Sequence, residues 1–176
     1  GGQGELIREP CDDCGGEGRR IEDRTYTVDI PAGVDTGSTL RLSGRGAAGV
    51  RGGPTGDLYV HVRVSPHERF TRVGEDLHCD LPISFAQAAL GAHLTFETLD
   101  GPEDLVIPRG TPSGREFRLR GRGVPHLERN VRGDLVVRVL VEVPDDLTEE
   151  QEELLRAYAA ARGEEVAPSE EGFFAK

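Results

Sequence analysis

Basic residues are scarce in this 176-residue chain, and their scarcity excludes several classes of protein. Twenty-one lysines and arginines stand against 32 aspartates and glutamates, which gives a formal net charge of −11. A protein that binds nucleic acid or anionic membranes through its overall charge needs a basic face. We therefore expect neither nucleic acid nor a membrane among the partners of this chain.

Long apolar runs and paired cysteines are also missing. No run of about 18 apolar residues is present to cross a bilayer, and we expect no signal peptide. Three cysteines, an odd number, make a poor disulfide framework, so a reducing compartment, the cytoplasm, is predicted. Methionine is absent even at residue 1, which predicts a fragment of a longer protein.

Glycine is abundant, and many of the 24 glycines follow an internal repeat. Residues 30–64 match residues 107–141 at a constant offset of 77, with 15 identities in 35 positions and no gap. Such self-similarity indicates two copies of one structural unit. The matching stretches are Ile30-Pro31-x-Gly33 with Ile107-Pro108-x-Gly110, Gly37 with Gly114, Arg41-Leu42-x-Gly44-Arg45-Gly46 with Arg118-Leu119-x-Gly121-Arg122-Gly123, Gly56-Asp57-Leu58 with Gly133-Asp134-Leu135, and Val60, Val62 and Val64 with Val137, Val139 and Val141.

Each copy has the pattern of β-strands separated by glycine turns. In residues 25–30 and 58–64, apolar and polar side chains alternate with the period of two that is typical of a half-buried strand. The glycines shared by the two copies are expected at turns that precede the next short strand. Further strands are predicted near residues 76–82, 93–98, 103–107 and 134–143.

A short helix is predicted between the two copies, over residues 84–91. The side chain of Ser84 can cap the first turn, and Gln87 stands three residues later, as in a capping box. Gly91 is the residue type that ends helices. These residues therefore define both ends of the helix.

A longer helix is predicted from Thr148 to Gly163. Thr148 and Gln151 form a second capping box, and the glutamates around Gln151 place negative charge at the positive end of the helix dipole. An apolar stripe favours packing of this helix against another surface, whereas the tail at 164–176 is expected to be mobile. The stripe comprises Leu147, Leu154, Leu155 and Tyr158.

Cys11-Asp12-Asp13-Cys14 is a C-x2-C pair, the spacing at which two thiolates reach one metal ion from a tight turn. Gly15-Gly16-Glu17-Gly18 follows it, and Gly1-Gly2-Gln3-Gly4 nearly repeats this ending. An earlier C-x2-C-x-G-x-G element is therefore expected just before residue 1. A structural zinc site needs four ligands, so we interpret the pair as half of such a site.

Other interpretations of the cysteine pair stay open. It could be a free dithiol, or a thioredoxin-like redox pair, although glycine loops rather than a strand–helix junction flank it. Cys79 or one of the five histidines could complete a metal site. His78 and Cys79 are neighbours on a predicted strand and face opposite ways, which favours Cys79 as a small buried apolar residue.

In this order, the motifs resemble the C-terminal part of a DnaJ-type (Hsp40, class A) co-chaperone. The resemblance extends from residue 1 into the C-terminal helix, and Phe173-Phe174 resemble the family's C-terminal aromatic pair. The matching stretches are Pro10-Cys11-x-x-Cys14-x-Gly16-x-Gly18, Ile30-Pro31-Ala32-Gly33-Val34-Asp35-x-Gly37, Gly56-Asp57-Leu58, His67-x-x-Phe70-x-Arg72-x-Gly74-x-Asp76-Leu77, Gln87-Ala88-Ala89-Leu90-Gly91, Thr98-Leu99-Asp100-Gly101 and Phe117-Arg118-Leu119-x-Gly121-x-Gly123.

The resemblance implies an all-β fold with short helices, built from two tandem β-sandwich-like domains and a C-terminal helix that forms a homodimer. It also implies zinc as the cofactor. Cys11 and Cys14 match the fourth of four C-x2-C repeats, and their partner ligands belong to the absent first repeat. The domains expected are a remnant of the zinc-binding region at 1–22, the first sandwich at 23–100, the second at 101–146, the dimerisation helix at 147–163 and the tail at 164–176.

The implied function is to hold unfolded polypeptide clients and to deliver them to an Hsp70 partner. In the family, a shallow apolar groove on the first sandwich binds the polypeptide. Tyr26 and Val60 match its walls, and Val28, Leu58 and Val62 lie nearby on the same strand faces. From the residues alone, ordinary sandwich core remains the alternative for all five.

We expect no enzyme. No Ser–His–Asp set or pair of carboxylates stands out, and Asp57 and Asp134 hold equivalent places in the two copies, where they are expected to cap turns. The J domain is absent from this sequence, so the chain is not expected to stimulate ATP hydrolysis by Hsp70. A second possible function is a thiol redox or zinc-transfer module that uses Cys11 and Cys14.

Overall fold

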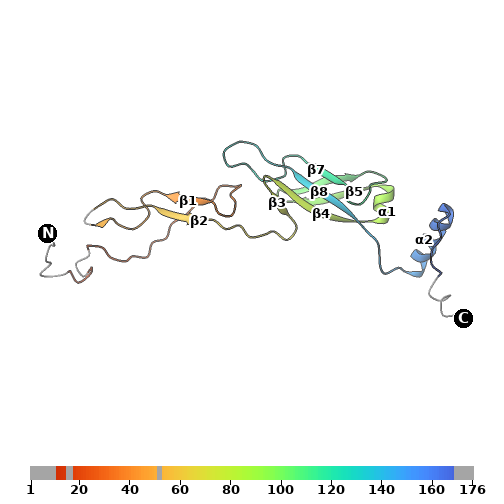
Figure 1. The fold of residues 1–176 in the computed structure, drawn as a ribbon, viewed down its shortest axis with the longest axis horizontal. Helices are drawn as coiled ribbons and strands as arrows, with labels where there is room; N and C mark the ends of the chain where they lie inside the picture. Colours follow the sequence, from red (N-terminus) through yellow and green to blue (C-terminus); the bar gives the residue numbers. More distant parts are fainter. Residues whose placement is uncertain (1–10, 15–17, 51–52, 169–176) are drawn as a thin grey trace, which may run out of the picture. The chain divides into compact units, whose positions relative to one another are not determined.

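The computed structural model describes residues 11–14, 18–50 and 53–168. Within them, eight strands form three small sheets, and two helices complete the fold (Figure 1). This confirms the expected mostly β fold with a short helix and a C-terminal helix. No helix in this part of the chain is both long and apolar enough to cross a membrane.

The chain divides into two compact units. The first comprises Gly1–Cys79 with Arg118–Val137, and the second comprises Asp80–Phe117 with Arg138–Lys176. The sandwich boundaries expected from the resemblance remain a prediction.

In the first unit, β1 (Thr39–Leu42) and β2 (Leu58–His61) form a two-stranded antiparallel sheet. β2 begins where the alternating pattern begins, and it is shorter than the predicted strand 58–64. Pairing nevertheless continues past its end, because the Val62 N–H donates to the Ser38 carbonyl at 2.8 Å.

Residues 25–30, predicted as a strand, are not one in the structure. Among the described residues the segment has no hydrogen-bonded partner strand, and a strand exists only as part of a ladder. The alternation is partly visible in exposure, since Tyr26 and Val28 are half-buried while Thr27 and Asp29 are exposed. Ile30, the third apolar residue of the pattern, is 59% exposed. The period of two therefore marks the partial burial of two side chains rather than a paired strand.

The largest sheet has the strand order β3-β4-β8-β7. These strands are β3 (Thr71–Val73), β4 (Asp76–Ser84), β7 (Glu116–Leu119) and β8 (Leu135–Glu142), and they agree with the strands predicted near 76–82 and 134–143. In the first unit the buried apolar side chains are Phe70, Leu77, Cys79, Leu135, Val136 and Val137. In the second unit they are Ile83, Ala88, Phe96, Leu105, Ile107, Val139 and Ala159.

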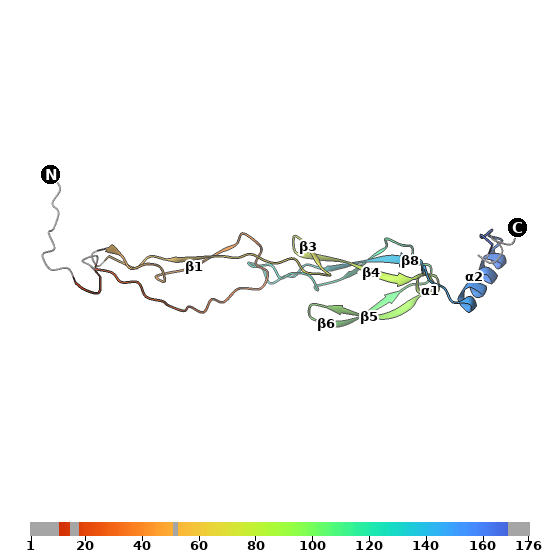
Figure 2. The ribbon, with the colours of Figure 1, turned by 90° about the horizontal axis from the view of Figure 1, so that it is seen from below.

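The second unit contains α1 (Phe85–Leu90) and the hairpin of β5 (Ala92–Thr98) and β6 (Gly101–Ile107). The predicted cap is confirmed, because the Ser84 and Gln87 side chains bond each other's backbone N–H groups. The hairpin pairs Ala92 with Ile107 at one end and Thr98 with Gly101 at the other. Its turn points away from α1 (Figure 2).

The C-terminal helix, α2 (Glu149–Arg162), has the predicted caps at both ends. Thr148 and Gln151 form the capping box, and Gly163 takes a left-handed conformation with φ 72°. The ring of Tyr158 contacts the ring of Phe85 edge to face, with centroids 5.8 Å apart. The predictions for Gly1–Gly4 and Phe173–Phe174 fall outside the described residues.

The two copies of the repeat make the same hydrogen bonds at equivalent positions, which confirms that they are copies of one unit. The carboxylates of Asp57 and Asp134 accept the N–H of Gly44 and Gly121 at 2.8 and 2.9 Å. Backbone carbonyls accept the next two pairs: Gly56 and Gly133 from the N–H of Gly46 and Gly123 (both 2.8 Å), and Val62 and Val139 from the N–H of Gly37 and Gly114 (3.0 and 2.7 Å). The hydroxyls of Thr36 and Ser113 accept the N–H of Val64 and Val141 at 2.9 and 3.0 Å.

Candidate functional site

The sheet of β1 and β2 presents an aliphatic face. Leu40 lies opposite Val60, and Leu42 lies opposite Leu58. Directly opposed residues in an antiparallel pair point to the same side of the sheet. All four side chains are half-buried, whereas Tyr59 between them is 55% exposed. The structure therefore brings two of the predicted groove residues onto one apolar face with two leucines.

Leu40 and Leu42 were not among the predicted groove residues. The signal was present in the sequence, because both alternate with polar residues and because the offset of 77 aligns them with Phe117 and Leu119. Val62 follows β2 with the same alternation and is half-buried. It therefore continues the face beyond the end of the strand.

Tyr26 and Val28 belong to the segment that forms no strand, so the sheet pairing does not join them to this face. Both side chains are half-buried. The guanidinium carbon of Arg45 lies 5.4 Å from the centroid of the Tyr26 ring, within the range of a cation–π contact. Arg45 therefore contacts the only aromatic residue among the predicted groove positions.

The same strand positions have different burial in the two copies. Leu135, Val137 and Val139, the counterparts of the groove residues of the first copy, are all 0% exposed. Leu58 and Val60 are half-buried. Ordinary core therefore describes the second copy, while the first copy keeps an apolar face that is only half covered.

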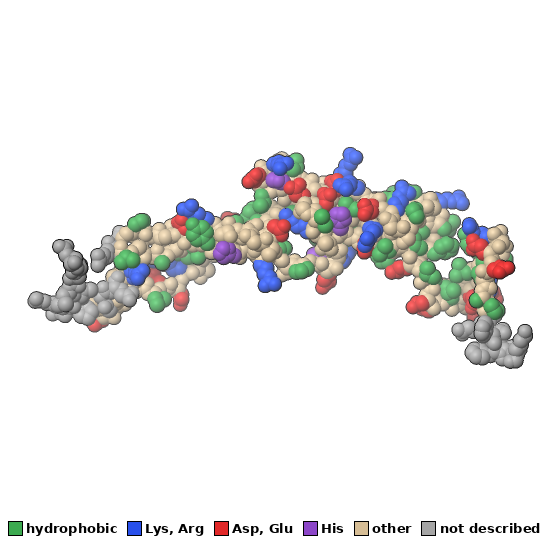
Figure 3. Space-filling model, in the orientation of Figure 1, with side chains coloured by type: hydrophobic (Ala, Val, Ile, Leu, Met, Phe, Trp, Pro, Cys, Tyr) green, Lys and Arg blue, Asp and Glu red, His purple; other side chains and the backbone are tan. Residues whose placement is uncertain are grey.

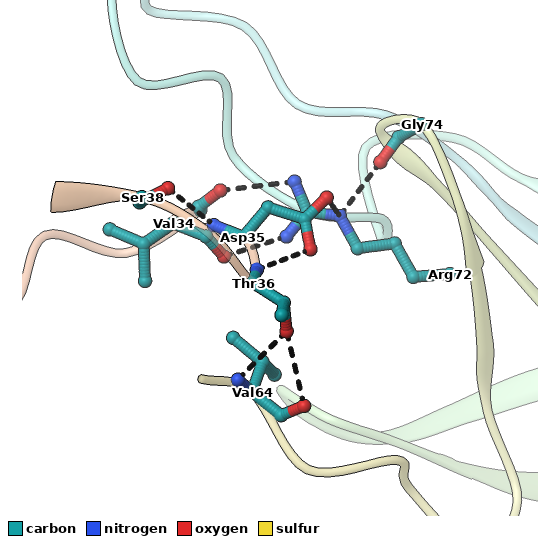
Figure 4. A network of polar contacts seen from close by, with 8 residues as sticks. Val34, Asp35, Thr36, Ser38, Val64, Arg72 and Gly74 are labelled. Atoms are coloured by element: carbon teal, nitrogen blue, oxygen red, sulfur yellow. Dashed lines mark hydrogen bonds and ion pairs between the residues drawn. The ribbon is translucent and has the colours of Figure 1, made fainter. Parts of the chain in front are cut away.

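Arg72 holds the turn that precedes β1 (Figure 4). Its guanidinium donates to the Val34 carbonyl at 2.8 Å, to the Gly33 carbonyl at 3.0 Å and to the Gly74 carbonyl at 2.8 Å. Asp35 lies 3.9 Å from the same guanidinium. Two motifs far apart in the sequence, one around residue 35 and one around residue 72, are therefore parts of one contact.

Asp57 and Asp134 cap turns, as predicted. The Gly44 N–H bonds the Asp57 carboxylate and, with the Arg41 guanidinium, holds the pKa of that carboxyl below its usual range. The Gly121 N–H and then Arg118 lower the pKa of Asp134 in the same way. The hydrogen bonds of both carboxylates therefore stabilise turns, which agrees with a structural rather than a catalytic role.

Cys11 and Cys14 flank a single turn, in which the Cys14 N–H donates to the Cys11 carbonyl at 3.3 Å. None of the three cysteines forms a disulfide, and Cys79 is buried on β4, as expected of a small apolar residue. Among the described residues, no group of three or more His, Cys, Asp or Glu side chains is arranged to hold a metal ion. A structural zinc site needs four ligands, and the described part of the chain brings only the two thiols of this turn together.

Comparison with known proteins gives the same assignment as the motifs. Residues 7–144 match the family described as DnaJ C terminal domain, and residues 150–176 match the one described as Chaperone protein DnaJ C-terminal region. Among the similar proteins are the Chaperone protein DnaJ of Acetivibrio thermocellus, 48% identical over 175 residues, and that of Rhizobium meliloti, 46% identical over 177 residues.

These alignments cover 99% and 100% of this chain but only 45% and 47% of the relatives, so the chain spans about half the length of the curated proteins it matches. The relatives carry the names of chaperones, which agrees with the expectation that the chain is not an enzyme. Since the family match covers most of the chain and the fold is mostly β with a C-terminal helix, this chain belongs to the DnaJ C-terminal domain family.

Proposed function

We propose that this chain holds unfolded polypeptide along the aliphatic face of β1 and β2, for delivery to an Hsp70 partner by the longer protein. The observation that carries the proposal is the difference in burial between the copies. Val137 is part of a closed core, whereas its counterpart Val60 lies on a face that is only half covered. Apolar surface left at such a place is available to a client.

The geometry of the sheet suits an extended peptide. Among the described residues, β1 and β2 pair only with each other, so each has an outer edge whose backbone groups a peptide can bond. Main-chain bonds give affinity without reading the client's sequence, and side chains that reach the aliphatic face add about 1.5–3 kcal/mol each. After the entropy cost of binding, about micromolar affinity is expected, which suits capture and release.

Val60→Asp tests this proposal, with Tyr59→Asp as the matched control. The two positions are neighbours on β2 and face opposite sides of the sheet. In a fluorescence anisotropy titration with a labelled apolar peptide, Val60→Asp is expected to bind at least about tenfold more weakly, or about 1.4 kcal/mol. Tyr59→Asp is expected to bind like the wild type. Unchanged affinity in a correctly folded Val60→Asp variant would contradict the proposal.

We also propose that α2 forms a homodimer. Its apolar stripe is accessible, since Leu154 is 65% exposed and Tyr158 is 44% exposed. Apolar and acidic side chains share its surface (Figure 3). Sedimentation of the whole chain over a concentration series is expected to show a dimer that Leu154→Glu dissociates. A monomer at all concentrations would rule out this role.

Cys11 and Cys14 are proposed to form half of a zinc site that an added first C-x2-C repeat completes. A redox or zinc-transfer module remains the second candidate, because the exposed Cys11 lies in the same turn as Cys14. A peptide carrying the missing repeat separates the two functions. The structural role predicts zinc uptake by the chain and peptide together, whereas the redox role predicts an unusually reactive Cys11 in the chain alone.

A further inference from the structure

The first copy of the repeat differs in charge from the chain as a whole. Residues 18–64 contain seven arginines and five carboxylates, while the complete chain carries a net charge of −11. Arg20 and Arg24 pair with Glu22, and Arg41 pairs with Asp57. By sequence, this segment therefore carries a small excess of positive charge.

Arg45 is the arginine that contacts a predicted groove residue, Tyr26. The described residues give it no carboxylate partner, and its guanidinium lies over the ring of Tyr26 at 5.4 Å. A cation–π contact does not use the N–H groups of the guanidinium as hydrogen-bond donors to an oxygen, so they stay available to an acceptor. A carboxylate is the acceptor that matches a guanidinium best.

From this arrangement we infer that Arg45, positioned by Tyr26, selects clients in which a carboxylate follows or precedes the apolar anchor. The inference rests on the function proposed above and names its specificity. An aspartate or glutamate beside the anchor bonds the guanidinium without displacing it from the ring. A lysine or arginine at the same place meets a like charge and is disfavoured.

The second copy supports a role in binding rather than in turn structure. The turn sequence Gly-Arg-Gly is shared, with Arg122 at the position of Arg45. The same offset of 77 places Glu103, not an aromatic residue, at the position of Tyr26. The Gly-Arg-Gly turn therefore forms with Glu103 in place of the tyrosine, so the contact between Arg45 and Tyr26 is not needed to make the turn.

The inference is tested with three labelled peptides that share one apolar core and carry aspartate, serine or lysine flanks. In anisotropy titrations of the complete 176-residue chain, the aspartate-flanked peptide is expected to bind about two- to fivefold more tightly than the lysine-flanked one, the range of an exposed ion pair. The preference is expected to shrink as salt is added. Arg45→Ala is expected to abolish the preference and to leave the serine-flanked peptide unaffected.

Arg129→Ala is the matched control, because it removes the same charge from an exposed position outside the first copy. Arg129→Ala is expected to keep the preference for aspartate flanks in full. Arg45→Lys is expected to keep part of this preference. Equal affinity of the wild type for aspartate and lysine flanks, or a preference that persists in Arg45→Ala, would overturn the inference alone. Failure of all three peptides to bind would overturn the proposed function as well.

Discussion

The two copies of the repeat share their hydrogen bonds and differ in their burial. Asp57 and Asp134 accept equivalent N–H bonds at 2.8 and 2.9 Å, yet Val137 is 0% exposed while its counterpart Val60 is half-buried. The turn residues set the backbone of each copy locally. Burial depends instead on the strands alongside. β8 lies between β4 and β7, whereas β2 has β1 as its one partner strand within the described ranges.

Equal local structure can therefore support unequal roles. In the second copy the aliphatic side chains are closed core. In the first copy the equivalent side chains are only half-buried, which supports the client-binding role proposed above. The same substitution made at equivalent positions of both copies tests whether the difference in burial has energetic consequences.

Leucine truncation is expected to give the largest contrast. Leu135→Ala opens a cavity in a closed core and is expected to lower the free energy of unfolding by about 3 kcal/mol. Leu58→Ala removes a half-buried side chain and is expected to cost about 1 kcal/mol. Urea unfolding of the two variants measures the difference. Equal losses would mean that the first copy is closed core as well.

Alanine at the equivalent glycines Gly33 and Gly110 is expected to give the next largest contrast. Both have positive φ, 99° and 73°. A Cβ at Gly33 would also overlap the carbonyl oxygen of Pro125, whereas a Cβ at Gly110 meets open space. Gly33→Ala is expected to cost about 2–3 kcal/mol and Gly110→Ala about 1 kcal/mol. Thermal unfolding followed by circular dichroism checks the order, which a reversed ranking would contradict.

Acid is expected to affect the two turn carboxylates alike. Folding lowers the pKa of Asp57 and Asp134, so each stabilises the fold above its unfolded pKa of about 3.9, and this contribution is lost as the pH falls through the folded pKa. Asp57→Asn and Asp134→Asn are therefore expected to lower the Tm at pH 6, with a difference from wild type that shrinks below about pH 4. A difference that stays constant down to pH 3 would contradict this role.

The smallest effect is expected from the hydroxyls that bond the ends of the two copies. Thr36 accepts the Val64 N–H, and Ser113 accepts the Val141 N–H. Replacing either by alanine is expected to lower the free energy of unfolding by about 0.5–1.5 kcal/mol. The losses are expected to be nearly the same in both copies, since the two accepted bonds are equivalent and exposed, and the further bond from the Thr36 hydroxyl to the Val64 carbonyl is long, at 3.3 Å. Unequal losses of unfolding free energy, measured in urea, would show that the different burial of the two copies also affects these bonds.

Local signals in the sequence predicted the fold well. The capping boxes at Ser84 and Thr148 and the end of α2 at Gly163 were predicted because neighbouring residues decide these features. The repeat likewise identified turns whose hydrogen bonds recur in the structure. Each of these features needs information from only a few adjacent positions.

Features that depend on distant partners were not predictable in the same way. Residues 25–30 alternate like a strand, but strand formation needs a partner that the alternation does not reveal. The spacing of apolar residues at Leu58 and Val60 is the same as at Leu135 and Val137. It therefore does not indicate in which copy these side chains are fully buried. Leu40 joins the candidate site through its pairing with Val60, a long-range contact.

Arg72 makes the opening of one turn an all-or-none event. A single guanidinium bonds the carbonyls of Gly33, Val34 and Gly74, so its withdrawal releases all three together. Local opening of the segment before β1 is therefore expected to have one cooperative step rather than gradual fraying. In hydrogen exchange, the amides of Asp35 and Thr36, which bond side chains of the same turn, should exchange at a common rate that rises together when Arg72 is lost.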